Sequence, residues 1–270
     1  MTGRMRMDGK TVLITGATDG LGRELAIRLG TAGARVLVHG RDAERADQVR
    51  TTVLAAGGPE PEVLLADLAS LREVDRLAAG VTGEVDILVN NAGIGFGRTG
   101  APRQLSADGI ELRFAVNYLA GYRLTRLLLP RLTERIVNVS SAGQQPIDFS
   151  DPMLDHGYDG ISAYRRSKLA QIMFTIDLAD ELGTGGITVN SLHPATFMNT
   201  TMVTSGGYNP MSTVAEGADA TLRLITAPDL PTGRYFNGLR EARADAQAYD
   251  ADARKRLRHL SDDLIARTLH

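Results

Sequence analysis

The chain has 270 residues, of which 43% are apolar, and its 30 basic and 32 acidic side chains leave a net charge of −2. It is long enough to bury a core as one domain or a tight pair. Cysteine is absent from the sequence, which excludes thiol catalysis, disulfide frameworks and cysteine-ligated metals. The near-zero net charge argues against a nucleic-acid partner. Only three basic residues are lysines: Lys10, Lys168 and Lys255.

The sequence gives no sign of a membrane segment or a metal site. No stretch approaches the roughly 18 uncharged apolar residues of a spanning helix, and residues 1–10 lack the apolar part of a signal peptide. We therefore expect a soluble, cytoplasmic protein with no membrane partner. The five histidines are scattered without ligand spacing, so no metal site is expected.

Short apolar runs rich in β-branched residues alternate along the chain with longer amphipathic segments, which is typical of βαβ units. The predicted strands are 11–15, 35–39, 62–66, 86–89, 135–139, 188–192 and 234–236. The predicted helices are 20–32, 42–56, 70–81, 107–132, 161–183, 213–227 and 245–268. The pattern predicts one doubly wound α/β domain over residues 1–270, with a seven-stranded parallel sheet flanked by helices.

Two connections, residues 142–160 and 194–212, are longer than a compact domain needs. Both follow predicted strand C-termini, where open α/β sheets bind their ligands. We expect them to form the walls of a substrate pocket, the alternative being plain surface loops.

A glycine-rich segment joins the first strand to the first helix. Glycines allow a tight turn there and let backbone N–H groups approach a pyrophosphate, whose charge is favoured at a helix N-terminus. The candidate cofactor-binding residues are Gly16, Thr18, Asp19, Gly20, Leu21 and Gly22. The alternative is a tight βα turn without a ligand.

The spacing T-G-x-x-x-G-x-G resembles the short-chain dehydrogenase/reductase family, and later motifs agree in order over about the whole chain. These are Asn91-Ala92-Gly93 after the fourth strand, Asn117, Ser140-Ser141 and Tyr164-x-x-x-Lys168. The sequence looks similar to the retinol-dehydrogenase-like branch. The resemblance implies a Rossmann-type fold that binds NAD(P), with Asn91, Ala92 and Gly93 near the cofactor.

Tyr164 and Lys168 lie four residues apart in a helical pattern and so share a face. A neighbouring ammonium should lower the phenol's pKa from about 10 and let Tyr164 act as general acid or base. The resemblance implies that Lys168 also bonds the nicotinamide ribose, that Ser141 holds the substrate oxygen and that Asn117 orders a relay water. Taken alone, each of these residues could be ordinary packing, a cap or a turn.

The end of the second strand bears on the choice of cofactor. Arg41 there suits the 2′-phosphate of NADP(H), which we favour, although Asp19 and the nearby Asp42 leave NAD(H) open. The resemblance assigns Asp67 and Leu68 to the adenine; helix caps are the alternative for Asp42 and Asp67.

Pro194 is expected to close over the nicotinamide. Here Ala195 replaces the family's usual glycine, and Thr200 comes one place late.

The sequence thus predicts an NADP(H)-dependent oxidoreductase acting on the carbonyl or alcohol of an apolar small molecule. The alternative is a catalytically silent NAD(P)-sensing or scaffold protein on the same fold. The resemblance implies a homodimer or homotetramer paired through helices 107–132 and 161–183.

Overall fold

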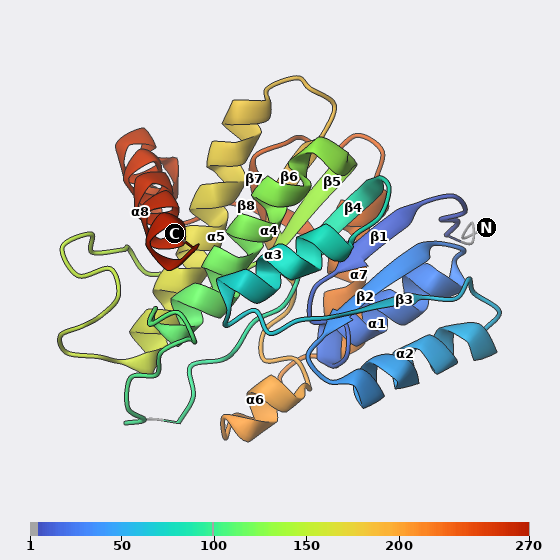
Figure 1. The fold of residues 1–270 in the computed structure, drawn as a ribbon, viewed down its shortest axis with the longest axis horizontal. Helices are drawn as coiled ribbons and strands as arrows, with labels where there is room; N and C mark the ends of the chain where they lie inside the picture. The colour runs from blue at the N-terminus through green and yellow to red at the C-terminus, as the bar shows by residue number, and fades with distance from the viewer. Residues whose placement is uncertain (1–4, 99, 270) are drawn as a thin grey trace.

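The computed structural model describes residues 5–98 and 100–269, which form a mostly parallel sheet between two layers of helices (Figure 1). The strand order is β3-β2-β1-β4-β5-β6-β7-β8. The strands are β1 Thr11–Ile14, β2 Arg35–Gly40, β3 Glu62–Leu65, β4 Val85–Asn90, β5 Leu132–Val139, β6 Thr188–His193, β7 Arg234–Asn237 and β8 Arg240–Ala242. The first seven run parallel, and β8 returns antiparallel to β7.

The helices divide between the faces of the sheet because the strand side chains alternate between two apolar clusters. Leu13 of β1, for example, packs toward one face, whereas Val12 and Ile14 pack toward the other. One face carries α3 Leu71–Gly80, α4 Ala120–Leu128, α5 Gly160–Leu182 and α8 Ala251–Leu269. The other carries α1 Gly20–Thr31, α2 Ala43–Ala55 and α7 Val214–Thr226. Both faces are buried, as a parallel sheet requires.

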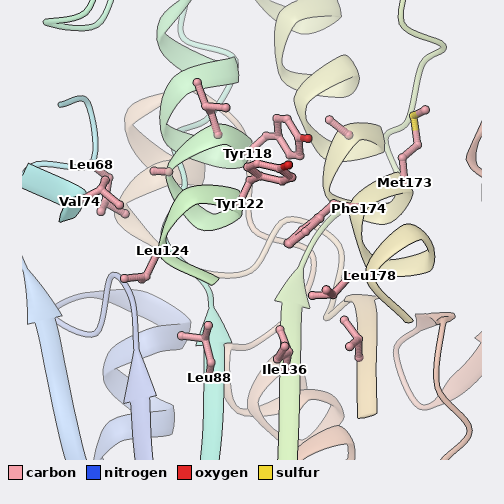
Figure 2. Close-up of a cluster of buried hydrophobic side chains, with 14 of the residues drawn as sticks. Leu68, Val74, Leu88, Tyr118, Tyr122, Leu124, Ile136, Met173, Phe174 and Leu178 are labelled. Atoms are coloured by element: carbon pink, nitrogen blue, oxygen red, sulfur yellow. The ribbon is translucent and has the colours of Figure 1, made fainter. Parts of the chain in front are cut away.

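The C-terminal helix α8 packs beside α5 (Figure 1) and also contacts α3. It covers an aromatic cluster in which Tyr118, Tyr122 and Phe174 lie together (Figure 2). The Tyr118 hydroxyl hydrogen-bonds the Ser261 hydroxyl of α8 at 2.8 Å, and Tyr122 donates to Asp262 at 2.7 Å. The two helices that the sequence assigned to a subunit interface are therefore covered in part by the chain's own last helix.

Three sequence predictions need correction. The sheet has eight strands, because the short polar segment Arg240–Ala242 adds an antiparallel edge strand. The helix predicted from 107 becomes helical only at 112, because residues 107–110 form a turn between the bridged Leu105 and Glu111. The last predicted helix is two elements, a 3₁₀ turn Ala246–Tyr249 and then α8.

Within the two long connections, only 194–212 contains a helix, the short α6 Thr201–Ser205. Within the described residues, no helix has both the length and the apolar character needed to span a membrane.

Candidate active site

The glycine-rich loop between β1 and α1 depends on backbone approaches that a side chain would block. Gly16 has a φ of +64°, and a Cβ there would lie 2.9 Å from the Cα of Ala92. A Cβ on Gly22 would lie 2.2 Å from the Gly16 carbonyl oxygen. Gly20, with a φ of +49°, faces the Thr200 side chain. The loop is thus packed tightly against Ala92, just after β4, and leads into the N-terminus of α1, where an anion is favoured.

Two polar side chains, the half-buried Asn91 and the buried His39, hold this loop. The Asn91 amide donates to the carbonyl oxygens of Thr15 and Gly16 at 2.8 and 3.1 Å. His39, 2% exposed, accepts from the Gly16 N–H at 3.2 Å through Nδ1, and its Nε2 lies 3.1 Å from the Ala66 carbonyl oxygen. Burial lowers the pKa of His39 to about 4, so the ring is neutral at physiological pH.

A cavity of about 610 Å³ opens beside the loop, between the carboxyl ends of β2 and β3. Its lining includes Thr18, Arg41, Asp42, Arg45 and Asp67. Arg45 was missed by sequence reasoning, because it lies in the first turn of α2 and only the fold turns it toward Arg41.

The remaining predicted residues around this loop have structural partners. Asp19 caps α1 by accepting from the Gly20 N–H at 2.7 Å, and Asp42 caps α2 by accepting from the Arg45 N–H at 3.1 Å. Leu21 and Leu68 are 5% and 6% exposed and pack in the apolar cores, and Leu68 does not line the cavity.

These features fit a dinucleotide. A pyrophosphate would lie at the N-terminus of α1, and the adenosine end would lie in the cavity. The two guanidinium groups of Arg41 and Arg45 suit a 2′-phosphate. They are 70% and 55% exposed and pair only loosely with carboxylates, Arg41 with Asp67 at 3.8 Å and Arg45 with Asp19 at 3.9 Å.

The predicted catalytic side chains converge at the carboxyl end of β5. Tyr164 and Lys168 lie on one face of α5, with the Lys168 Nζ atom 5.8 Å from the Tyr164 ring centre. Ser141, just after β5, is close enough to the Tyr164 phenol to offset part of the rise in its pKa. The neighbouring Ser140 hydroxyl instead donates to the Lys168 carbonyl oxygen at 2.7 Å, so of the two serines Ser141 serves the phenol.

The expected lowering of the Tyr164 pKa by Lys168 is wrong for this structure. Burial raises the pKa of Tyr164, and the Ser141 side chain offsets part of that rise. Burial also lowers the pKa of Lys168 to about 7, because the residue is only 4% exposed and forms no ion pair with a carboxylate among the described residues. Lys168 donates to the Val139 carbonyl oxygen and to the Gln171 side chain, each at 2.9 Å.

Asn117 lies in a π-helical turn, Phe114–Leu119, that leads into α4. Its side chain accepts from the Ile94 N–H at 2.7 Å and donates to the Ser167 hydroxyl at 3.0 Å. Gly93 lies between Asn117 and Lys168, since a Cβ there would be 3.3 and 3.4 Å from their polar atoms. The turn, the loop after β4 and α5 therefore meet at one point, and π turns are frequent at functional sites.

The connection 194–212 lies beside the glycine-rich loop. Pro194 is buried just after β6, and Thr200 lies against Gly20 of the glycine loop.

An aromatic wall was not foreseen. The Phe96 ring meets Tyr164 edge-on at 4.8 Å and Tyr208 edge-on at 5.1 Å, and Tyr208 stacks on Phe197 at 5.3 Å. Phe197 has a φ of +43°, a strained conformation for a bulky residue and one that tends to occur at functional sites.

Among the residues that the structure describes, no cluster of three or more potential metal ligands occurs.

Comparison with known proteins agrees with this geometry. A family model described as short chain dehydrogenase matches residues 10–208. The chain is 36% identical to mouse retinol dehydrogenase 14, over 96% of this chain and 86% of that protein.

Solved structures agree as well. An uncharacterised protein from Mycobacterium paratuberculosis matches with a TM-score of 0.83 and 31% identity, over 98% of this chain and 96% of its own. The landomycin C-6 ketoreductase LanV, solved with NADP and rabelomycin, matches with a TM-score of 0.68 and 30% identity, over 86% of this chain and 95% of its own.

Proposed function

The chain belongs to the short-chain dehydrogenase family, oxidoreductases that act on CH–OH and C=O groups with NAD(P), and we propose that it is an NADP(H)-dependent reductase of planar, apolar carbonyl compounds. The observation that carries the proposal is the convergence of Ser141, Tyr164 and Lys168 beside Gly93, within reach of the glycine loop. An oxidoreductase needs acid–base residues beside its nucleotide-binding site, whereas a catalytically silent sensor needs only the nucleotide-binding site.

The preference for NADP(H) rests on the cavity beside the glycine loop. Arg41 and Arg45 both line it, and two planar guanidinium groups can bind a phosphate through paired hydrogen bonds. Similar chains have been solved with NADP bound, which supports the same choice.

The chain's own residues supply the proton chemistry. When bound, a nicotinamide supplies or accepts the hydride. Ser141 donates a hydrogen bond to the substrate oxygen, and Tyr164 gives that oxygen its proton in reduction or removes it in oxidation. Because the pKa of Tyr164 is raised, its protonated form predominates at neutral pH, which favours the donor role in reduction. Lys168, whose pKa is near 7, can return a proton toward Tyr164.

The preferred shape of the substrate follows from the aromatic wall. Phe96 and Tyr208 present ring edges and faces next to Tyr164, and Tyr208 is itself backed by Phe197. Such walls stabilise flat, unsaturated skeletons through stacked and edge-on contacts. A ketoreductase is among the structural neighbours, which supports carbonyl substrates of this kind.

The test is NADPH oxidation, followed by absorbance, with a panel of aromatic, alicyclic and acyclic ketones and aldehydes. We expect turnover with the planar ketones, and a loss of about a hundredfold or more in kcat in Tyr164→Phe with NADPH affinity kept. Tyr249→Phe is the matched control, since its hydroxyl accepts from the Ala244 N–H in the connection after β8. Tight NADPH binding with no turnover across the panel would instead indicate the sensing protein.

A further inference from the structure

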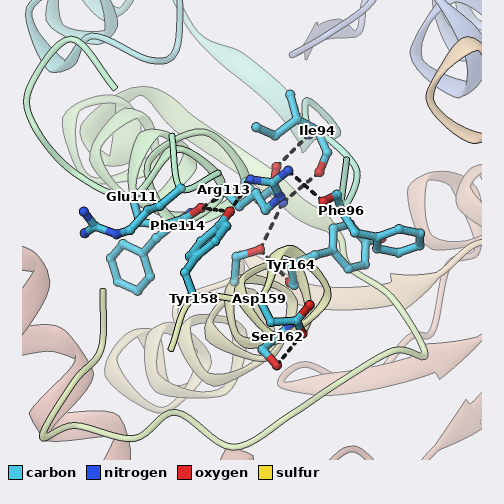
Figure 3. Close-up of polar contacts among 12 residues, drawn as sticks. Ile94, Phe96, Glu111, Arg113, Phe114, Tyr158, Asp159, Ser162 and Tyr164 are labelled. Atoms are coloured by element: carbon cyan, nitrogen blue, oxygen red, sulfur yellow. Dashed lines mark hydrogen bonds and ion pairs between the residues drawn. The ribbon is translucent and has the colours of Figure 1, made fainter. Parts of the chain in front are cut away.

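A buried polar network outside the acid–base group joins three segments of the active site (Figure 3). Its centre is Arg113, which is 3% exposed, and beside it Glu111 is 1% exposed. The Arg113 Nη1 atom lies 3.5 Å from the Glu111 Oε1 atom and 2.6 Å from the Tyr158 hydroxyl oxygen. A buried ion pair is stable only when its remaining hydrogen bonds are made. The hydrogen-bond partners of Arg113 and Glu111 therefore show which segments the pair holds together.

Arg113 holds the loop that follows β4. Its Nε donates to the Gly95 carbonyl oxygen at 2.9 Å, and its Nη2 donates to the Phe96 carbonyl oxygen at 2.8 Å. A Cβ on Gly97 would lie 2.7 Å from the same Nη2 atom. The guanidinium thus fixes the backbone from which the Phe96 ring reaches Tyr164.

Tyr158 lies in the long connection before α5 and bonds that connection to the network. Its hydroxyl accepts from Arg113 and donates to Glu111 at 3.2 Å, so it uses both of its hydrogen-bonding roles. Burial and the Glu111 carboxylate raise the pKa of Tyr158 to about 12, which keeps that donor proton in place.

Glycine at position 160 allows the close approach of this connection to the loop. A Cβ on Gly160 would lie 2.3 Å from the Phe96 carbonyl oxygen. Tyr158 comes two residues before α5, the helix that carries Tyr164.

The third segment is the π-helical turn. The Glu111 Oε2 atom accepts from the N–H of Phe114, the first residue of that turn, at 2.7 Å. Asn117, further along the turn, bonds the Ile94 backbone in both directions, by accepting from the N–H and donating to the carbonyl oxygen. The loop after β4 is therefore held from both sides, by Arg113 at residues 95 and 96 and by Asn117 at residue 94.

We propose that Arg113 is a positioning residue for the reaction, and that Tyr158 and Glu111 orient it so that Phe96 stays packed on Tyr164 and Gly93 stays beside Lys168. The inference deepens the proposed function and rests on it for its kinetic consequences. A network of this kind acts as a unit, because each partner fixes the geometry of the next. Small displacements at reacting groups are costly, and a shift of about 1 Å can lower a rate a hundredfold.

The decisive variant is Tyr158→Phe, which removes one hydroxyl and keeps the ring. We expect kcat with a planar ketone to fall about tenfold, the effect of losing one hydrogen bond to a charged group. The affinity for 2′,5′-ADP, which would occupy the cavity lined by Arg41 and Arg45, should stay within about twofold.

The pH profile supplies a readout that loss of stability alone would not move. As the Phe96 ring loosens, water reaches Tyr164, its raised pKa falls, and the alkaline limb of kcat shifts to lower pH. Arg113→Lys keeps the positive charge but loses the several N–H donors of the guanidinium. It should show the same shift of the alkaline limb to lower pH. Tyr249→Phe is the control and should leave the profile unchanged.

Backbone hydrogen exchange makes the test independent of turnover. Exchange in residues 93–97 should be faster in Tyr158→Phe than in wild type or Tyr249→Phe, with α1 and β1 unchanged. Wild-type exchange rates, kcat and pH profile in both network variants would overturn the proposal. If the wild type turned over no substrate, the proposed function would fail, and exchange alone would then decide whether Arg113 and Tyr158 hold the loop.

Discussion

The Nζ atom of Lys168 lies 5.8 Å from the centre of the Tyr164 ring, and of the two residues Lys168 is buried and Tyr164 half-buried. Burial therefore moves their pKa values in opposite directions, up for the phenol and down for the ammonium, so both neutral forms are favoured. The pair is suited to passing a proton between neutral groups.

Lys168 should make the stability of the fold depend on pH. Its pKa is 10.5 in the unfolded chain and about 7 in the fold, so between these values the folded state binds fewer protons. The free energy of unfolding should then rise with pH over this range, by up to about 1.4 kcal/mol per pH unit. Lys168→Met should flatten that rise, measured as the difference between the denaturation curves of the two proteins. Parallel curves from pH 7 to 10 would contradict the lowered pKa.

Arg45 should contribute to cofactor choice although no sequence motif marks it. Arg45→Ala and Arg41→Ala should each raise the KM for NADPH by about tenfold or more and leave the KM for NADH nearly unchanged, since only NADPH carries the 2′-phosphate. Arg50→Ala is the control on the same helix, because Arg50 pairs with Asp47 and Glu60 and does not line the cavity. An equal loss for both cofactors would remove the reason for preferring NADP(H).

His39 should make the glycine loop sensitive to acid. Its pKa is 6.5 in the unfolded chain and about 4 in the fold, so the folded state binds fewer protons between these values. The free energy of unfolding should therefore fall as the pH drops from about 6.5 to 4. His39→Asn should lose this dependence and keep an acceptor for the Gly16 N–H, whereas His39→Ala should bind NADPH more weakly. Calorimetric titration of NADPH and thermal melts at several pH values check both points.

Tyr208 should select flat substrates. Tyr208→Ala should raise the KM for a fused-ring ketone by about two- to tenfold, the usual worth of one aromatic contact, and barely change that for an acyclic ketone with the same number of carbons. Tyr208→Phe keeps the ring and serves as the control. Equal increases for the two ketones would indicate that the wall only shields the site from water.

The docked α8 leads us to expect a monomer of 28.9 kDa, since a partner pairing through α4 and α5 would have to displace it. Light scattering after size-exclusion chromatography gives the mass directly. Leu257, 2% exposed, holds α8 down, so Leu257→Asp should free the aromatic cluster and cause self-association or loss of the fold. Lys255→Asp, on the exposed side of the helix, is the control. A stable wild-type dimer would restore the interface that the family resemblance implies.

Local signals in the sequence were sufficient for the seven parallel strands and for placing Tyr164 and Lys168 on one helix. Apolar β-branched runs mark buried strands, and the four-residue spacing of Tyr164 and Lys168 fixes them on one helix face. Strand β8 was missed because Arg240–Ala242 is short and polar and depends on pairing with β7. The roles of Arg45, Arg113 and Phe96 depend on contacts between distant segments, which no periodicity encodes. The pKa of Tyr164 was misjudged because burial, which the whole fold sets, raises it.

Because α8 follows α4 and α5 in the sequence, it is translated after the residues that it covers. Leu257, Ser261 and Ile265 cover residues of α4 and α5 that are translated much earlier. Until they emerge, Tyr118 and its neighbours remain open to water or to chaperones. The nascent chain can therefore assemble its nucleotide-binding half well before its catalytic half is sealed, and a ribosome stalled before α8 would hold an incompletely closed enzyme.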